Sequence, residues 1–130
     1  MKIYLDFDGT VVEHNYPQTG AANEGCVVVI QKLQVAGHQI ILNTYRANIS
    51  AHALQIAVDY LATLDIEPIT EIQQKKINPP HWNLVNFKEK GELFIDDICE
   101  GTPLKKPQNV EYDIVDWATL DQLFQENNIY

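Results

Sequence analysis

The stretch Lys2-Ile3-Tyr4-Leu5-Asp6-Phe7-Asp8-Gly9-Thr10 joins an apolar segment to two carboxylates. Its apolar part, Ile3 to Leu5, has the β-branched, aromatic and aliphatic residues that favour a short buried strand. A buried carboxylate is costly unless it is paired or bound to a cation. Side chains two residues apart on a strand point the same way, so Asp6 and Asp8 should face one cleft, while Gly9 allows a sharp turn beside them. The stretch therefore predicts a strand that ends in a site for a cation with a phosphate, or in an acid/base pair.

The composition indicates one globular domain that covers residues 1–130, because 45% of the residues are hydrophobic. The net charge of −9 argues against a nucleic-acid-binding surface and against binding to an anionic membrane. No apolar stretch approaches the length of a membrane span. Two cysteines, Cys26 and Cys99, are too few for a disulfide framework, so a reducing, cytoplasmic location is expected.

Strand-like and helix-like segments alternate along the rest of the chain. After a loop that could form a flap over residues 11–23, helices are predicted from Asn23, from Ser50 and from Asp116, each with a polar residue as N-cap. Further strands are predicted over residues 38–43, 68–72, 92–95 and 112–115. This alternation predicts an α/β, three-layer Rossmann-like fold with a central parallel sheet of about five strands, covered on both faces.

Polar side chains follow three of these strands. They are Asp6 and Asp8 after the first, Asn43 and Thr44 after the second, and Asp96 and Asp97 after the fourth. Ligands of open α/β sheets bind at the carboxyl ends of the strands. Four carboxylates, a hydroxyl and a nearby lysine suit magnesium-assisted phosphoryl transfer.

Three other residues near these strand ends have plain structural explanations. His14 in the flap is expected to be a solvated loop side chain. Arg46, two residues after Thr44, could face the cleft, although a solvated loop arginine is favoured. Cys26 falls on the apolar stripe of the first helix and is expected to be a packed thiol.

The motifs resemble those of the haloacid dehalogenase (HAD) superfamily. Asp6-Phe7-Asp8-Gly9-Thr10 after an apolar strand looks like its first motif, Thr44 after Ile40-Ile41-Leu42 is similar to its second, and Asp96-Asp97 after Leu93-Phe94-Ile95 is similar to its fourth. The order and spacing agree over nearly the whole chain. The resemblance implies a phosphatase with Mg²⁺ as cofactor and an aspartyl-phosphate intermediate.

The resemblance also implies a role for each matching residue. Asp6 would be the nucleophile and a magnesium ligand, and Asp8 would be the general acid/base, with its carbonyl also binding the metal. Thr44 would bind the phosphoryl group. Asp96 would coordinate magnesium, and Asp97 would support it directly or through water.

The lysine of the third motif has four candidates by order, which are Lys75, Lys76, Lys88 and Lys90. Lys76 is the predicted one, because the family lysine often lies just ahead of prolines, as in Lys76-Ile77-Asn78-Pro79-Pro80. Taken one at a time, each of these lysines would by default be a solvated surface residue.

The spacing of the motifs leaves no room for a cap domain, so a small member without a cap is expected. The partner would be a phosphorylated substrate, either a small molecule or a macromolecule, and a homo-oligomer could close the open site.

Three rival interpretations can be compared with the same residues. An EF-hand calcium loop fails, because Thr10 stands where an acidic or amide residue is needed and the glycine is misplaced. A response-regulator receiver would place a lone phosphoacceptor aspartate on the third strand, whereas here the second acidic pair follows the fourth. A non-catalytic or regulatory module that binds phosphate or metal with the same fold stays open, and turnover of a phosphate ester would separate it from an enzyme.

Overall fold

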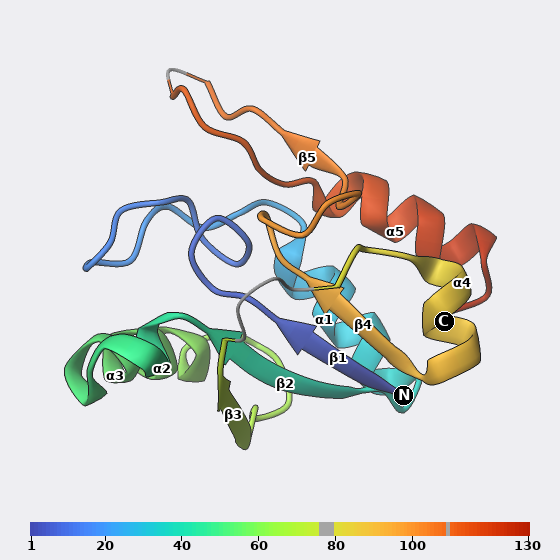
Figure 1. Ribbon diagram of the computed structural model, residues 1–130, viewed down its shortest axis with the longest axis horizontal. Helices are drawn as coiled ribbons and strands as arrows, with labels where there is room; N and C mark the ends of the chain where they lie inside the picture. Colours follow the sequence, from blue (N-terminus) through green and yellow to red (C-terminus); the bar gives the residue numbers. More distant parts are fainter. Residues whose placement is uncertain (76–79, 109) are drawn as a thin grey trace.

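A computed structural model describes residues 1–75, 80–108 and 110–130 of the chain. It is an α/β structure with a four-stranded parallel sheet in the order β3-β2-β1-β4 (Figure 1). The strands are β1 (Lys2–Leu5), β2 (Gln39–Thr44), β3 (Glu71–Gln74) and β4 (Glu92–Ile95). In the sheet register Leu5 pairs with Leu42 on one side and with Ile95 on the other. The residues that follow these strands therefore meet at one edge of the sheet.

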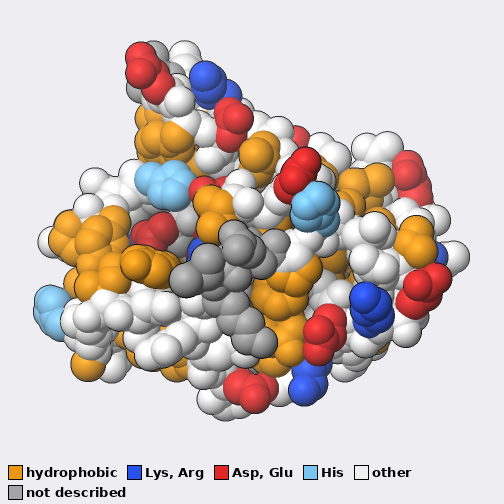
Figure 2. Space-filling view, in the orientation of Figure 1, with side chains coloured by type: hydrophobic (Ala, Val, Ile, Leu, Met, Phe, Trp, Pro, Cys, Tyr) orange, Lys and Arg blue, Asp and Glu red, His pale blue; other side chains and the backbone are white. Residues whose placement is uncertain are grey.

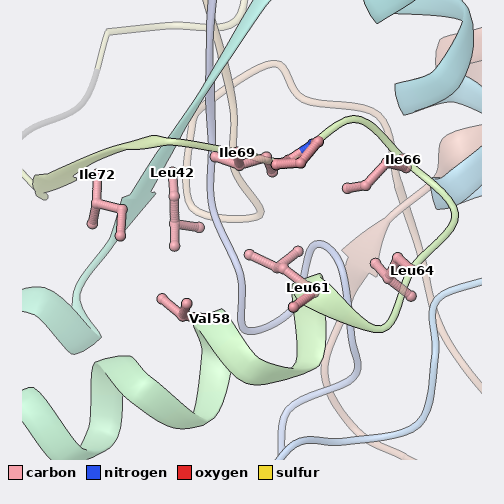
Figure 3. Close-up of a pocket in the computed structure, with 9 residues that line it drawn as sticks. Leu42, Val58, Leu61, Leu64, Ile66, Ile69 and Ile72 are labelled. Atoms are coloured by element: carbon pink, nitrogen blue, oxygen red, sulfur yellow. The ribbon is translucent and has the colours of Figure 1, made fainter.

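One face of the sheet is buried against helices. Its side chains include Ile3, Leu5 and Leu93, which are all buried in the main hydrophobic core. Helices α1 (Cys26–Val35) and α5 (Trp117–Glu126) contact one another, and α1 lies behind the sheet in Figure 1. Helix α3 (Ala51–Ala62) packs at the outer end of this face, where its apolar side chains meet Leu42 and Ile72 (Figure 3).

The opposite face of the sheet differs from the expected third layer. It carries the stacked rings of Tyr4 and Phe94, whose centroids are 4.5 Å apart and which stay partly exposed. Helix α4 (Leu84–Lys90) flanks β4 at its side and does not cover it (Figure 1). Helix α4 buries Phe87 beside His38 and does not lie over the face that carries Tyr4 and Phe94. The described elements thus form two layers, a sheet and the helices on its other face.

Two of the three predicted helix starts are confirmed. Ser50 and Asp116 cap α3 and α5, and their side chains accept hydrogen bonds from backbone N–H groups three residues on. The first helix begins at Cys26, and Asn23 does not cap it. Its side-chain amide donates instead to the carbonyl oxygens of Thr10 and Val115, at 2.9 and 2.8 Å. Asn23 therefore ties the loop after β1 to the C-terminal part of the chain.

The fifth strand of the parallel sheet was predicted wrongly. Residues Ile114–Val115 (β6) pair antiparallel with Leu104–Lys105 (β5) in a separate two-stranded sheet. The N–H of Val115 donates to the carbonyl of Gly9 at 3.0 Å, so this segment supports the loop after β1. A short helix, α2 (Arg46–Ile49), follows β2 directly and was not predicted.

None of the helices in the described ranges has the length and apolarity needed to cross a lipid bilayer.

Candidate functional site

Three carboxylates converge at the carboxyl edge of the sheet. Asp6 follows β1, Asp96 and Asp97 follow the neighbouring β4, and each offers an oxygen within 4.8 Å of the others. We call these three residues the acidic cluster. Asp6 and Asp96 are buried, with exposed fractions of 3% and 0%. Carboxylates that are this close together and buried from solvent repel one another unless a cation lies between them.

Lys75 supplies one positive charge to the acidic cluster. Its Nζ lies 2.8 Å from Asp6 Oδ1 and 2.8 Å from Asp96 Oδ2. The second contact is an ion pair and not a well-directed hydrogen bond, so Asp96 Oδ2 has no hydrogen-bond partner among the described residues. The backbone of Lys75 is fixed by Asn48 of α2, whose side chain bonds its N–H at 2.9 Å and its carbonyl at 3.2 Å.

One ammonium does not balance three carboxylates. Burial and the charge of Asp96 raise the pKa of Asp6 well above its usual value, although Lys75 opposes the shift. Burial and the neighbouring Asp96 raise the pKa of Asp97 to about 7. Burial alone would lower the pKa of Lys75, but the carboxylates of Asp6 and Asp96 outweigh it and raise the pKa. Such a cluster of oxygen ligands with uncompensated charge fits a hard divalent cation such as Mg²⁺.

The turn after β1 holds the acidic cluster in place. The hydroxyl of Thr10 donates to Asp6 Oδ2 at 2.9 Å. His14 Nε2 lies 2.8 Å from Asp97 Oδ2, so the expectation of a purely solvated histidine was wrong. Gly9 has a positive φ of 78°, and a Cβ there would lie 2.2 Å from His14 Nε2 and 2.4 Å from Asp97 Oδ2. Only glycine therefore permits this contact.

The second aspartate of the first motif has a partner of its own. Asp8 accepts two hydrogen bonds from Arg46, from Nε to Oδ2 and from Nη2 to Oδ1, both at 2.8 Å. We call these two residues the Arg46–Asp8 pair. The expectation of a solvated arginine was wrong, because the Arg46 side chain is only 1% exposed.

The other donors of Arg46 are used as well. Its Nη atoms donate to the carbonyl oxygens of Pro17, Gln18 and Ala53, at 2.8, 3.0 and 3.1 Å. The guanidinium also lies 5.2 Å from the ring centre of Phe7 and 5.0 Å from that of Tyr16. Arg46 thus ties the flap to α3 and to Asp8.

Asp6 and Asp97 of the acidic cluster line one cavity of about 270 Å³ together with the Arg46–Asp8 pair. Its walls carry Asp6, Asp8, Asp97, Lys75 and Arg46, together with aromatic and aliphatic side chains. Figure 2 shows a hollow with an acidic side chain at its base and hydrophobic side chains and a histidine around it.

The structure can be compared with each predicted site residue. Asp6, Asp96 and Asp97 are brought together, while the carboxylate of Asp8 lies in the same cavity but is turned toward Arg46. Thr44 is buried at the end of β2, where its Oγ1 accepts the N–H of Arg46 at 3.2 Å, and no described hydrogen bond joins it to Asp6.

The lysine of the site can be placed only in part. Lys76, the predicted residue, lies outside the described residues, whereas its neighbour Lys75 contacts the acidic cluster. Lys88 and Lys90 are exposed on α4. Among the described lysines, Lys75 is therefore the one at the site.

Sequence reasoning did not foresee two contacts of the site, the pairing of Arg46 with Asp8 and the contact of His14 with Asp97, and Lys75 was only one of four candidate lysines. The signal for Arg46 was its place two residues after a strand that ends at the site. The signal for Lys75 was its position directly after β3, at the same edge of the sheet.

The chain is similar in structure to a conserved protein from Bacteroides thetaiotaomicron. The two are 26% identical, with a TM-score of 0.60 over 97% of this chain and 90% of that chain. No family model matches the chain, and no protein of curated description matches it. The likeness supports the α/β architecture over nearly the full length, and the neighbour's description names no activity.

Proposed function

We propose that this protein is a magnesium-dependent phosphatase of the HAD type, which forms an aspartyl-phosphate on Asp6. The observation that carries the proposal is the setting of Asp6. One oxygen of this carboxylate is held by Lys75 at 2.8 Å and the other by Thr10 at 2.9 Å. Asp6 lies within reach of two further carboxylates and lines a cavity together with Lys75.

The residues of the acidic cluster would hold the metal. Asp6, Asp96 and Asp97 offer the oxygen ligands that Mg²⁺ prefers, and the backbone carbonyl of Asp8 is the further ligand that the HAD resemblance implies. When bound, the cation would offset the repulsion between an anionic nucleophile and an anionic phosphate.

Each residue then has one task. An oxygen of Asp6 forms a bond to phosphorus while the bond from phosphorus to the leaving oxygen breaks, which gives an acyl phosphate and a free alcohol. Lys75 stabilises the charge on the transferring group, and Thr44 is the proposed ligand of its outer oxygens. Asp8 gives a proton to the leaving oxygen and later takes one from the water that releases phosphate.

The Arg46–Asp8 pair is the observation that favours the alternative, a non-catalytic module that binds phosphate or metal. Both oxygens of Asp8 are engaged by Arg46. However, a carboxylate has about four acceptor sites, so a bidentate arginine leaves lone pairs free. One of them can carry the proton that Asp8 gives to the leaving oxygen, or accept the proton of a water. The side chain of Asp8 also keeps 19% of its surface exposed, and it lines the cavity.

Hydrolysis of an aryl phosphate tests the proposal. The wild-type protein should hydrolyse p-nitrophenyl phosphate in the presence of Mg²⁺, and this hydrolysis should stop when a chelator removes the metal. Asp6→Asn should lose all turnover and all covalent labelling by phosphate. Asp8→Asn should keep phosphate binding but lose turnover by about 100-fold or more, the usual scale of general acid/base help.

Activity that survives the chelator would contradict the proposed metal role. Failure on a panel of sugar, nucleotide, aryl and protein phosphates, with phosphate binding intact, would support the binding module instead. Unchanged turnover in Asp8→Asn would remove Asp8 from the mechanism.

A further inference from the structure

The mouth of the cavity carries a group of exposed hydrophobic side chains. Ten large hydrophobic residues are exposed in the described part of the chain, and four of them, Tyr16, Tyr45, Ile49 and Ile98, line this one cavity. We call these four residues the apolar rim. Exposed hydrophobic residues scattered singly are ordinary, but a group of them beside a cluster of buried charges indicates a binding surface.

The apolar rim is built from three separate segments that also position the charged residues. Tyr16 belongs to the flap, and its ring is stacked on the guanidinium of Arg46. Tyr45 and Ile49 are four residues apart at the two ends of the first turn of α2, so they lie on one side of it. Ile98 follows β4, and its N–H donates to Asp96 Oδ1 at 3.1 Å. The rim is therefore held in register with the acidic cluster.

The charges of the cavity limit what else it can recognise. Lys75 contacts two carboxylates of the acidic cluster. The N–H groups of Arg46 donate hydrogen bonds to Asp8 and to three backbone carbonyl oxygens. Beyond the place for one phosphoryl group, the described lining thus offers no unpaired cation for a second phosphate or a carboxylate. The rim's polar groups are the two tyrosine hydroxyls, which are few for a sugar with many hydroxyl groups.

We propose that this cavity binds the phosphate monoester of an aromatic alcohol, with the phosphoryl group at the acidic cluster and the ring against the apolar rim. This inference rests on the proposed function. The volume agrees with it, because a cavity of about 150 Å³ holds one benzene molecule, and the cavity here of about 270 Å³ leaves space for a phosphoryl group as well. Tyrosine rings bind a second aromatic ring by offset stacking or edge contacts.

Binding of two non-hydrolysable phosphonates tests the inference without turnover. Calorimetry with Mg²⁺ present should show benzylphosphonate binding about tenfold or more tightly than methylphosphonate, which lacks the ring. Tyr45→Ala should remove most of this preference and leave methylphosphonate affinity unchanged, because the side chain of Tyr45 is 60% exposed. Tyr45→Phe, which keeps the ring, should retain the preference. Val85→Ala, an equally exposed residue of α4 outside the cavity, is the matched control.

The outcomes separate the two proposals. Equal affinity for the two phosphonates, absence of binding by either, or a ring preference that survives Tyr45→Ala would overturn the aromatic site. A phosphoserine peptide, which carries no ring at its phosphate, that binds far more tightly than benzylphosphonate would overturn it in favour of a protein partner. Ring preference without hydrolysis of any ester would contradict the phosphatase and leave an aromatic phosphate as a bound ligand. Hydrolysis without ring preference would overturn the inference alone.

Discussion

Two members of the acidic cluster, Asp6 and Asp97, line one cavity with the Arg46–Asp8 pair, but the charges of the cluster and of the pair are balanced differently. In the acidic cluster, three carboxylates meet one ammonium group, and an oxygen of Asp96 has no hydrogen-bond partner among the described residues. In the pair, one carboxylate meets one guanidinium, whose remaining donors reach backbone carbonyls. The cluster therefore has negative charge left over to bind a cation, whereas the charges of the pair cancel.

The difference assigns separate tasks to residues that the first motif places only two positions apart. Asp6 belongs to the cluster with excess negative charge and is suited to act as the nucleophile. Asp8 points to the balanced side, where Arg46 connects it to the flap and to α3. Changes in the cluster should thus act mainly on metal binding and catalysis, whereas loss of Arg46 from the pair should act mainly on stability.

The largest effect is expected from the lysine of the cluster. Lys75→Ala should lower kcat/KM by about 100- to 1,000-fold, because a charge aimed at the transferring group acts in a largely buried site. Its unfolding midpoint should fall little, since the loss leaves carboxylates that can take up protons. Lys88→Ala on the exposed surface of α4 is the matched control and should keep wild-type activity.

Lys76→Ala is the second arm of this experiment, because Lys76 lies outside the described residues. Its activity should stay close to the wild type. If Lys76→Ala were inactive and Lys75→Ala active, the catalytic role would belong to Lys76 and not to Lys75.

The next effect concerns stability. Arg46→Ala should lower the free energy of unfolding by about 3–5 kcal/mol, because it leaves Asp8 without a partner and three backbone carbonyls without a donor. Urea unfolding measures this change. The control is Lys32→Ala, which breaks the partly exposed ion pair with Asp121 and should cost about 0–1 kcal/mol. Equal losses in the two variants would show that the Arg46–Asp8 pair is not a structural tie.

The smallest effect is a dependence on pH. The pKa of Asp97 rises from 3.8 to about 7 on folding, so folding favours its protonated form. The stability that this group contributes is complete below about pH 4 and is lost as the pH rises through about 7. Mg²⁺ binds the ionised carboxylates, so its affinity should fall below pH 7 by up to about tenfold per unit.

Thermal unfolding with and without Mg²⁺ between pH 5.5 and 8 measures both trends. The rise in Tm that Mg²⁺ causes should grow over this range, and Asp97→Asn should flatten the growth. A rise in Tm that is the same at both ends would contradict the charge imbalance of the acidic cluster.

Much of the site's framework could be predicted from the sequence. Apolar strands that end in carboxylates are a local pattern, and the parallel register then brings Asp6 and Asp96 to the same edge. The strand expected at residues 112–115 failed because Val115 bonds to the loop after β1 and β6 pairs with β5. Local periodicity does not say which partner a short apolar segment will choose.

The partners of the carboxylates were harder to predict for a similar reason. Lys75 lies 69 positions from Asp6, and Arg46 lies 38 positions from Asp8. A long charged side chain can reach several groups, so the packing of the whole fold selects one. The position of the Arg46 side chain is fixed by hydrogen bonds to carbonyl oxygens of the flap and of α3 as well as by Asp8. No rule of sequence spacing predicts this combination of partners.

Calorimetric titration with Mg²⁺ at pH 8 tests most directly the claim that the acidic cluster holds a cation and the Arg46–Asp8 pair does not need one. The wild-type protein should bind one Mg²⁺ per chain, Asp96→Asn should show no binding heat, and Asp8→Asn should still bind, since its carboxylate is directed at Arg46. Thermal unfolding of each variant confirms that it is folded. Absence of Mg²⁺ binding by the wild type, or unchanged binding by folded Asp96→Asn, would contradict the account.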